Sequence, residues 1–164
     1  MTTKKVAFLG LSIALAMILS YVESQIPALI AIPGIKVGLP NLIIVFTLYK
    51  VGAKEAVVVS IIRIFLVSLL FGNLQTMTFS IAGATVSLIS MIVLRKLNWF
   101  SSITVSIVGG VFHNVGQIIA ACFWTQTAEI VLYLPVLLIS GTLAGAVIGF
   151  IAGILVKRLE KWKL

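Results

Sequence analysis

An arginine in the middle of an apolar run is the first side chain of this sequence that could do chemistry. Arg63 stands within the run Ala56–Phe71, which contains no other charged residue. A guanidinium in such a run is costly to bury unless it reaches a cavity, a partner or lipid headgroups. Two interpretations stay open: Arg63 snorkels or caps helix carbonyls as a structural residue, or it binds an anionic group of a ligand.

A second group of polar side chains, His113, Asn114 and Gln117, lies in the middle of the apolar run Ile103–Trp124. His113 and Gln117 are one helical turn apart, so they share a helix face with Asn114 beside them. They could contact a ligand, or they could form hydrogen bonds that only hold helices together, and we favour ligand contact. No carboxylate or thiol is spaced to share a metal ion with the single histidine, so we expect no metal site.

The sequence lacks the residue sets that several classes of enzyme need. It contains no Asp, and its four Glu are spread over predicted helix ends and loops, which leaves too few ligands for metal-dependent phosphate chemistry. No Gly-rich loop ending in Lys-Ser or Lys-Thr is present to hold nucleotide phosphates. We therefore expect no catalysis by this chain and no cofactor. If ATP drives its function, another subunit must hydrolyse the nucleotide.

Long apolar runs must position these side chains. Because 61% of the 164 residues are hydrophobic and the mean hydropathy is +1.25, most of the surface must face lipid. We predict an all-α integral membrane protein whose single domain, residues 1–164, is one bundle of six transmembrane helices. The predicted spans are residues 6–22, 37–49, 56–71, 74–94, 103–124 and 134–156.

The segment Ile26–Ile35 is apolar but contains Pro27, Pro33 and Gly34. It is too short to cross a membrane and cannot stay helical through its second proline. We expect a loop or a partial, re-entrant helix that lies over one mouth of the bundle. Interrupted segments at membrane depth are tolerated only against protein or a water-filled cavity, so this mouth is a candidate binding region.

Positive charge marks one side of the predicted bundle. Ten of the twelve Lys and Arg residues fall in alternate loops and at both termini, and Lys36 and Arg63 are the exceptions. The positive-inside rule therefore places both termini in the cytoplasm and the protein in the cell membrane as a multi-pass protein. The Trp and Tyr residues fall at both predicted boundaries, as in aromatic belts. We assign the net charge of +8 to contact with anionic lipid headgroups rather than with nucleic acid.

With this orientation, most polar side chains fall in the outer half of the bundle. Ligand pockets between helices combine apolar walls with a few converging polar groups. Glu23 and Gln126 are interpreted as solvated loop residues that take no part in such a pocket. We predict a pocket that is open to the outside and binds its ligand through six residues, namely Arg63, His113, Asn114, Gln117, Asn41 and Lys36.

Small residues recur at helical spacing in two of the predicted spans. In the last span they form a stripe for close helix packing that consists of Gly141, Gly145, Gly149 and Gly153. Gly10 and Ala14 form a shorter small-xxx-small pair in the first span. This pair could pack inside the bundle or dock another membrane subunit, and the pattern alone favours internal packing.

Four segments in this order resemble a known family, namely Ile32–Asn41 (IPGIKVGLPN), Ser60–Arg63 (SIIR), His113–Gln117 (HNVGQ) and Tyr133–Val136 (YLPV). They are similar to the Gx transporter family, also labelled heptaprenyl diphosphate synthase component I, over nearly the whole chain. Pro40 departs from the family pattern, in which a small residue is expected, and this departure bears only on the start of the second helix. The synthase label implies chain elongation of prenyl diphosphates, which the absence of Asp argues against for this chain.

The resemblance also implies an architecture like that of the substrate-binding S components of energy-coupling factor (ECF) transporters. In those proteins a small-xxx-small motif on the first helix docks the coupling subunit, which Gly10 and Ala14 match in place and spacing, and the loop after that helix covers the substrate. Our leading hypothesis is a substrate-binding subunit that takes up a small organic solute, anionic or amphipathic, with separate coupling and ATPase subunits. The alternative is a non-catalytic accessory membrane subunit of isoprenoid or quinone metabolism.

Overall fold

The computed structural model describes residues 2–26 and 37–160, and within them the chain forms six α-helices, one 3-10 helix and no strand. The predicted all-α class is therefore confirmed. The prediction for Ile26–Ile35 and the position of Lys36 fall almost entirely outside the described residues. The elements are α1 (Thr3–Gln25), α2 (Leu39–Lys50), α3 (Ala53–Phe71), α4 (Leu74–Leu97), α5 (Ser102–Thr125), η1 (Ala128–Tyr133) and α6 (Leu134–Arg158).

Local residue chemistry sets where these helices begin and end. Asn73 and Thr76 form a capping box at the start of α4, in which each side chain accepts a hydrogen bond from the other residue's backbone N–H. The Ser101 hydroxyl accepts a hydrogen bond from the Thr104 N–H at the start of α5. Pro40 lies in the first turn of α2, where the missing N–H costs nothing, and Gly38 precedes it with φ = 80°.

Four segments are long and apolar enough to cross a membrane: α1, α4, α5 and Ala128–Arg158. The other two helices, α2 and α3, do not meet these criteria, although the sequence predicted six spans. α2 has 12 residues, so it extends about 18 Å and cannot cross a hydrocarbon core of about 30 Å. α3 has 19 residues but carries Lys54, Glu55 and Arg63. The structure thus supports a membrane protein, in which four segments have the length and composition needed to cross.

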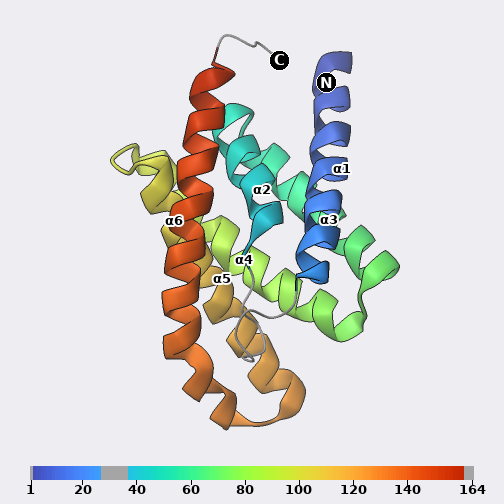
Figure 1. The fold of residues 1–164 in the computed structure, drawn as a ribbon, viewed down its shortest axis with the longest axis vertical. Helices are drawn as coiled ribbons and strands as arrows, with labels where there is room; N and C mark the ends of the chain where they lie inside the picture. Colours follow the sequence, from blue (N-terminus) through green and yellow to red (C-terminus); the bar gives the residue numbers. More distant parts are fainter. Residues whose placement is uncertain (1, 27–36, 161–164) are drawn as a thin grey trace.

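The helices form two groups that meet where α2 contacts α6 and where α3 contacts α4 (Figure 1). α5 packs along both α4 and α6, whereas α1, α2 and α3 pack against one another, and α2 also contacts α6. The start of α1 and the end of α6 lie at the same end of the molecule, which is called the terminal end below. A buried apolar cluster lies toward that end, since it is built from the early part of α1, α3 and α5 and the later part of α2, α4 and α6. It includes Phe8, Leu9, Val45, Leu48, Val59, Leu88, Val105 and Ala152.

Glycines bring α5 and α6 into close contact. A Cβ atom on Gly145 would lie 2.6 Å from Ile107 Cα, and one on Gly141 would lie 2.9 Å from Gly110 O. Gly149 and Gly153 continue the same face of α6 along the first turns of α5. Backbone-to-backbone contact of this kind is possible only without side chains, as in membrane helix pairs generally.

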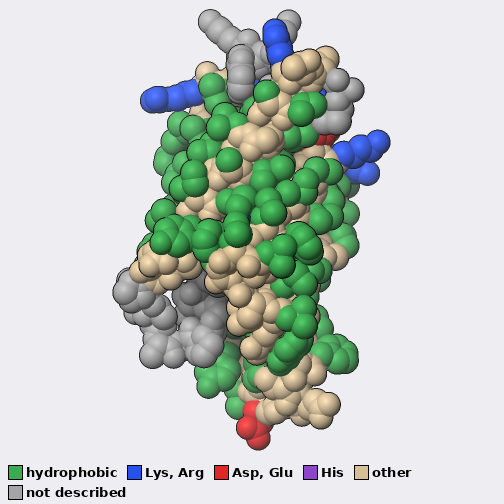
Figure 2. Space-filling model, turned by 90° about the vertical axis from the view of Figure 1, so that its right-hand side faces the viewer, with side chains coloured by type: hydrophobic (Ala, Val, Ile, Leu, Met, Phe, Trp, Pro, Cys, Tyr) green, Lys and Arg blue, Asp and Glu red, His purple; other side chains and the backbone are tan. Residues whose placement is uncertain are grey.

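The surface is apolar around the sides and basic at the terminal end (Figure 2). At this basic end, Lys50 donates a hydrogen bond from Nζ to Glu160 O at 3.3 Å, and Arg95 donates one to Tyr49 O at 3.4 Å. The Lys5 ammonium pairs with the Glu55 carboxylate and so connects α1 to α3. Basic side chains therefore hold helix ends together there, in addition to facing the surroundings.

Candidate functional site

A cavity of about 350 Å³ lies between the helices, in the middle part of the bundle. All six α-helices line it: α1 with its last turns, α2 with its first turns, α3 with its second half, and α4, α5 and α6 with their middle parts. The buried apolar cluster lies directly beside the cavity, and Val45, Met91 and Ile148 belong to both the cluster and the cavity lining. This volume is near the lower limit for sites that hold small molecules.

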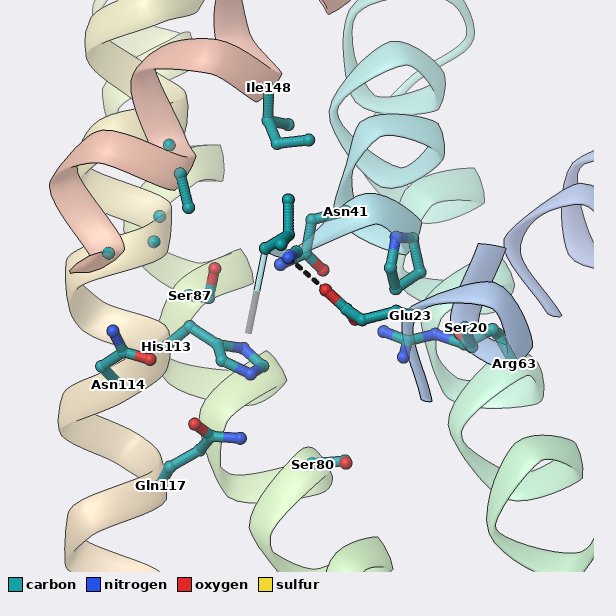
Figure 3. A pocket seen from close by; sticks show the side chains of 18 of the residues that line it. Ser20, Glu23, Asn41, Arg63, Ser80, Ser87, His113, Asn114, Gln117 and Ile148 are labelled. Atoms are coloured by element: carbon teal, nitrogen blue, oxygen red, sulfur yellow. Dashed lines mark hydrogen bonds between the residues drawn. The ribbon is translucent and has the colours of Figure 1, made fainter. Parts of the chain in front are cut away.

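The structure brings together five of the six residues that the sequence predicted to bind a ligand. Lys36 lies outside the described residues. In Figure 3, the α5 side chains lie on one side of the cavity and Arg63 lies on the other. The five residues that line the cavity are Asn41, Arg63, His113, Asn114 and Gln117.

Arg63 is the most unusual of these residues. Its side chain is only 8% exposed, and its Nε atom has no hydrogen-bond partner among the described residues. None of the carboxylates in residues 2–26 and 37–160 forms an ion pair with it. A buried guanidinium with unmet donors is costly, because burial removes water without supplying an acceptor. Such a group favours a ligand that brings an oxyanion into the cavity.

Glu23 is a cavity residue that sequence reasoning missed. It lies in the last turn of α1, is half-buried and lines the cavity, which corrects its interpretation as a solvated loop residue. Its Oε1 atom accepts hydrogen bonds from the backbone N–H groups of Gly38 and, at 3.3 Å, of Leu39 (Figure 3). Its charge also attracts the Arg63 guanidinium. The scarcity of acidic residues, four in the whole chain, was the signal that could have drawn attention to it.

Asn114 fits both roles that the sequence left open, a hydrogen bond between helices and contact with a ligand. Its Nδ2 atom donates a hydrogen bond of 2.5 Å to Leu137 O, which connects α5 to α6. The same side chain lines the cavity and lies against Gly141, where a Cβ atom would come within 2.7 Å of it. Its carbonyl oxygen is therefore the part that remains for a ligand, while its amide group holds two helices together.

Gly83 on α4 makes room for the other two polar side chains of α5. A Cβ atom at this position would lie 2.9 Å from His113 Cε1 and 3.0 Å from Gln117 Cγ. Gly83 was not singled out from the sequence, because a single glycine within an apolar run does not reveal its neighbour. It allows α4 and α5 to approach closely while their polar side chains share the cavity.

Hydroxyl groups extend the polar lining along the cavity. Ser80 and Ser87 come from α4 and Ser106 comes from α5, and all three were missed in the sequence. Met91 lies beside Ser87 at the same deep end, where its sulfur would be 2.5 Å from a Cβ atom on Gly109. Hydroxyls can donate or accept, so this part of the cavity suits polar but uncharged ligand atoms.

Among the described residues, no three His, Cys, Asp or Glu side chains gather as metal ligands. Cys122 is half-buried with a free thiol. The cavity therefore offers one guanidinium, one carboxylate, one imidazole, amides and hydroxyls. This set can bind and orient a polar or acidic small molecule through hydrogen bonds and charge.

The comparisons with known proteins agree with the resemblance noted in the sequence. The family model described as heptaprenyl diphosphate synthase component I matches residues 12–155, which is most of the 164-residue chain. No curated protein and no solved structure shows significant similarity to the chain. Because the match covers far more than half of its length, the chain belongs to the heptaprenyl diphosphate synthase component I family.

Proposed function

We propose that this protein is the substrate-binding subunit of a membrane transporter, similar in role to an ECF S component, and that it takes up a small organic solute. The observation that carries the proposal is the polar cavity, which contains a buried and unpaired guanidinium inside an otherwise apolar helical protein. Polar and ionisable groups at membrane depth are expensive and usually mark a pathway or a binding site.

The geometry of the cavity supports an anionic or amphipathic solute. An acidic group would pair with Arg63, and a polar group would reach Gln117 and His113 across the cavity. Asn41, at the start of α2, would add a donor and an acceptor between these two sides. The cavity volume of about 350 Å³ suits a compact molecule better than a long isoprenoid chain.

The proposed orientation puts the cavity on the outside. Lys and Arg side chains gather at the terminal end, which would be the cytoplasmic side of the cell membrane under the positive-inside rule (Figure 2). The cavity is lined by the last turns of α1, the first turns of α2 and the second half of α3, so on these helices it lies on the side away from the start of α1. A solute would therefore enter from the external medium.

Separate coupling and ATPase subunits would supply the energy, and α1 offers a face for docking them. Gly10 and Ala14 are both exposed, and no atom lies within 4 Å of the position that a Cβ on Gly10 would take. The pair therefore does not pack inside the described part of the bundle, contrary to what its pattern alone favoured. In the proposal this smooth surface packs against a helix of the coupling subunit.

Ligand binding by the purified chain tests the capture role. A panel of vitamins, flavins, quinone precursors and short organic acids is added, and thermal unfolding is followed by tryptophan fluorescence. At least one compound should raise the melting temperature, since binding to the native state alone stabilises it. The shift should disappear in Arg63→Gln and decrease in His113→Ala, but remain in the control Val147→Ala, which changes an exposed side chain on α6. A panel without any hit, or hits that ignore both cavity variants, would remove the basis of the proposal.

The family name favours a second candidate, a non-catalytic accessory membrane subunit that holds isoprenoid or quinone enzymes at the membrane. This candidate predicts co-purification with a prenyl diphosphate synthase through the cytoplasmic loops. The transporter proposal instead predicts co-purification with coupling and ATPase subunits, lost in Gly10→Leu and kept in Val147→Leu. Gly10 is exposed with open space beside it, so the larger side chain tests partner docking without disturbing the fold. In both candidates the chain itself has no catalytic role, in keeping with its lack of Asp.

A further inference from the structure

Glu23 connects the last turn of α1 to the start of α2. Its carboxylate accepts hydrogen bonds from the backbone N–H groups of Gly38 and Leu39. At the start of a helix such N–H groups have no partner within the helix, so the carboxylate supplies one. The positive end of the helix dipole adds to this attraction. We refer to these contacts as the α1–α2 clasp. It fixes a negative charge at the edge of the cavity.

Arg63 faces the same part of the cavity from α3, close to Glu23 (Figure 3). It is buried and its Nε atom is unpartnered, while Glu23 uses its Oε1 atom for the clasp. The two opposite charges thus line the same cavity, and no ion pair joins them in the described part of the chain. An incoming oxyanion would pair directly with the guanidinium, and it would then have to share the site with the negative charge of Glu23.

We propose that Glu23 is the resident counter-ion of Arg63 and thereby sets how tightly the cavity binds oxyanions. In the empty cavity Glu23 stabilises the buried guanidinium. In the loaded cavity it repels the ligand's acidic group, which keeps the affinity moderate. This inference rests on the cavity being the ligand site of the proposed function.

Glu23→Gln removes the negative charge of this side chain but keeps its size and shape. The amide oxygen of Gln can still accept the two backbone hydrogen bonds, so the clasp remains while the negative charge is lost. The inference predicts opposite effects of this single change on the empty and the loaded protein. The empty protein should melt about 2–6 °C lower, because Arg63 loses its counter-ion. Oxyanion affinity should rise at least about five-fold, the effect of removing one like charge about 4 Å away at water-like screening.

The probes are benzoate, with benzamide as its neutral counterpart, inorganic phosphate, and dihexanoyl phosphatidic acid. They separate a carboxylate, a free phosphate and a lipid headgroup as sources of the same oxyanion chemistry. Each probe is titrated against the full chain in detergent, with melting temperature as readout. Glu129→Gln is the matched control, because Glu129 is an exposed carboxylate outside the cavity lining. It should change neither the melting temperature nor the response to any probe.

The double variant Glu23→Gln/Arg63→Gln should regain the stability lost in Glu23→Gln and respond to none of the probes. If Glu23→Gln alone fails to fold and the double variant folds, the counter-ion role is supported directly. Four results would each overturn the inference. Two concern stability: Glu23→Gln melts at the wild-type temperature, or the double variant does not regain the lost stability. Two concern binding: the protein responds equally to benzamide and benzoate, or Glu23→Gln responds to no oxyanion. If the inference about Glu23 fails but compounds of the solute panel still raise the melting temperature, the proposed function stands. If no compound of the panel binds but the oxyanion probes behave as stated, the inference about Glu23 stands.

Discussion

Replacing Gly145 with alanine tests how tightly α5 and α6 are packed. The added Cβ would lie 2.6 Å from Ile107 Cα, 2.7 Å from Ser106 O and 3.0 Å from Ile107 N. All three atoms belong to backbone, so no side chain can rotate away. Since carbon atoms pack at about 3.5–4.0 Å, the two helices must move apart by roughly 1 Å at this point.

The expected loss of stability follows from two opposing effects. Overpacking a tight contact costs about 1–3 kcal/mol, whereas alanine is about 0.5–1 kcal/mol better than glycine within a helix. The net cost is then about 1–2 kcal/mol, or a melting temperature roughly 3–6 °C lower for a chain of this size. Because Gly145 also lines the cavity, the separation should in addition weaken the response to ligands that bind there.

Gly10→Ala is the matched control, because it makes the same chemical change in another helix. No atom lies within 4 Å of the added Cβ at this position. Only the gain in helix propensity remains, so this variant should melt at the wild-type temperature or slightly above it. Both variants are compared with the wild type in the same detergent by tryptophan fluorescence. If Gly145→Ala melts as high as Gly10→Ala, the close contact between α5 and α6 does not exist as described.

Three further predictions concern single contacts. Asn114→Leu removes the hydrogen bond to Leu137 O and should lower the free energy of unfolding by about 1 kcal/mol, which is measured as a lower melting temperature. An unchanged melting temperature would show that this bond does not stabilise the pairing of α5 and α6. Asn73→Ala removes the capping box of α4 and should also cost about 1 kcal/mol, whereas Asn73→Ser should restore most of it. The hydrogen bond with Lys5 lowers the pKa of Glu55 below its ordinary value of 4.5. The ion pair therefore stabilises the fold fully above pH 4.5, and this stabilisation is lost as the pH falls through the lowered pKa. Wild type should therefore melt above Glu55→Gln at pH 7, with a difference below about 1 kcal/mol because the pair is partly exposed, and the two curves should converge in acid. A difference that persists or grows in acid would contradict this assignment.

The sequence by itself determined which segments are helical and which polar side chains lie deep within them. Hydropathy and capping act over neighbouring residues, so apolar runs and signals such as Asn73 before α4 can be recognised without knowledge of the fold. The depth of Arg63 and His113 follows from the same local pattern, and both line the cavity. The sequence also identified the family, which the match over residues 12–155 confirms.

The tertiary structure decided which of these side chains meet and which residues complete the site. Glu23 is joined to the cavity by backbone donors 15 and 16 residues later in the chain, a contact that no local pattern encodes. Gly83 matters only because α5 passes directly beside it. α2 is too short to cross a membrane alone, yet it is held among the other helices and supplies Asn41 and the clasp. Such contacts depend on how helix faces rotate and cross, which packing between distant segments determines and residue spacing within one segment does not.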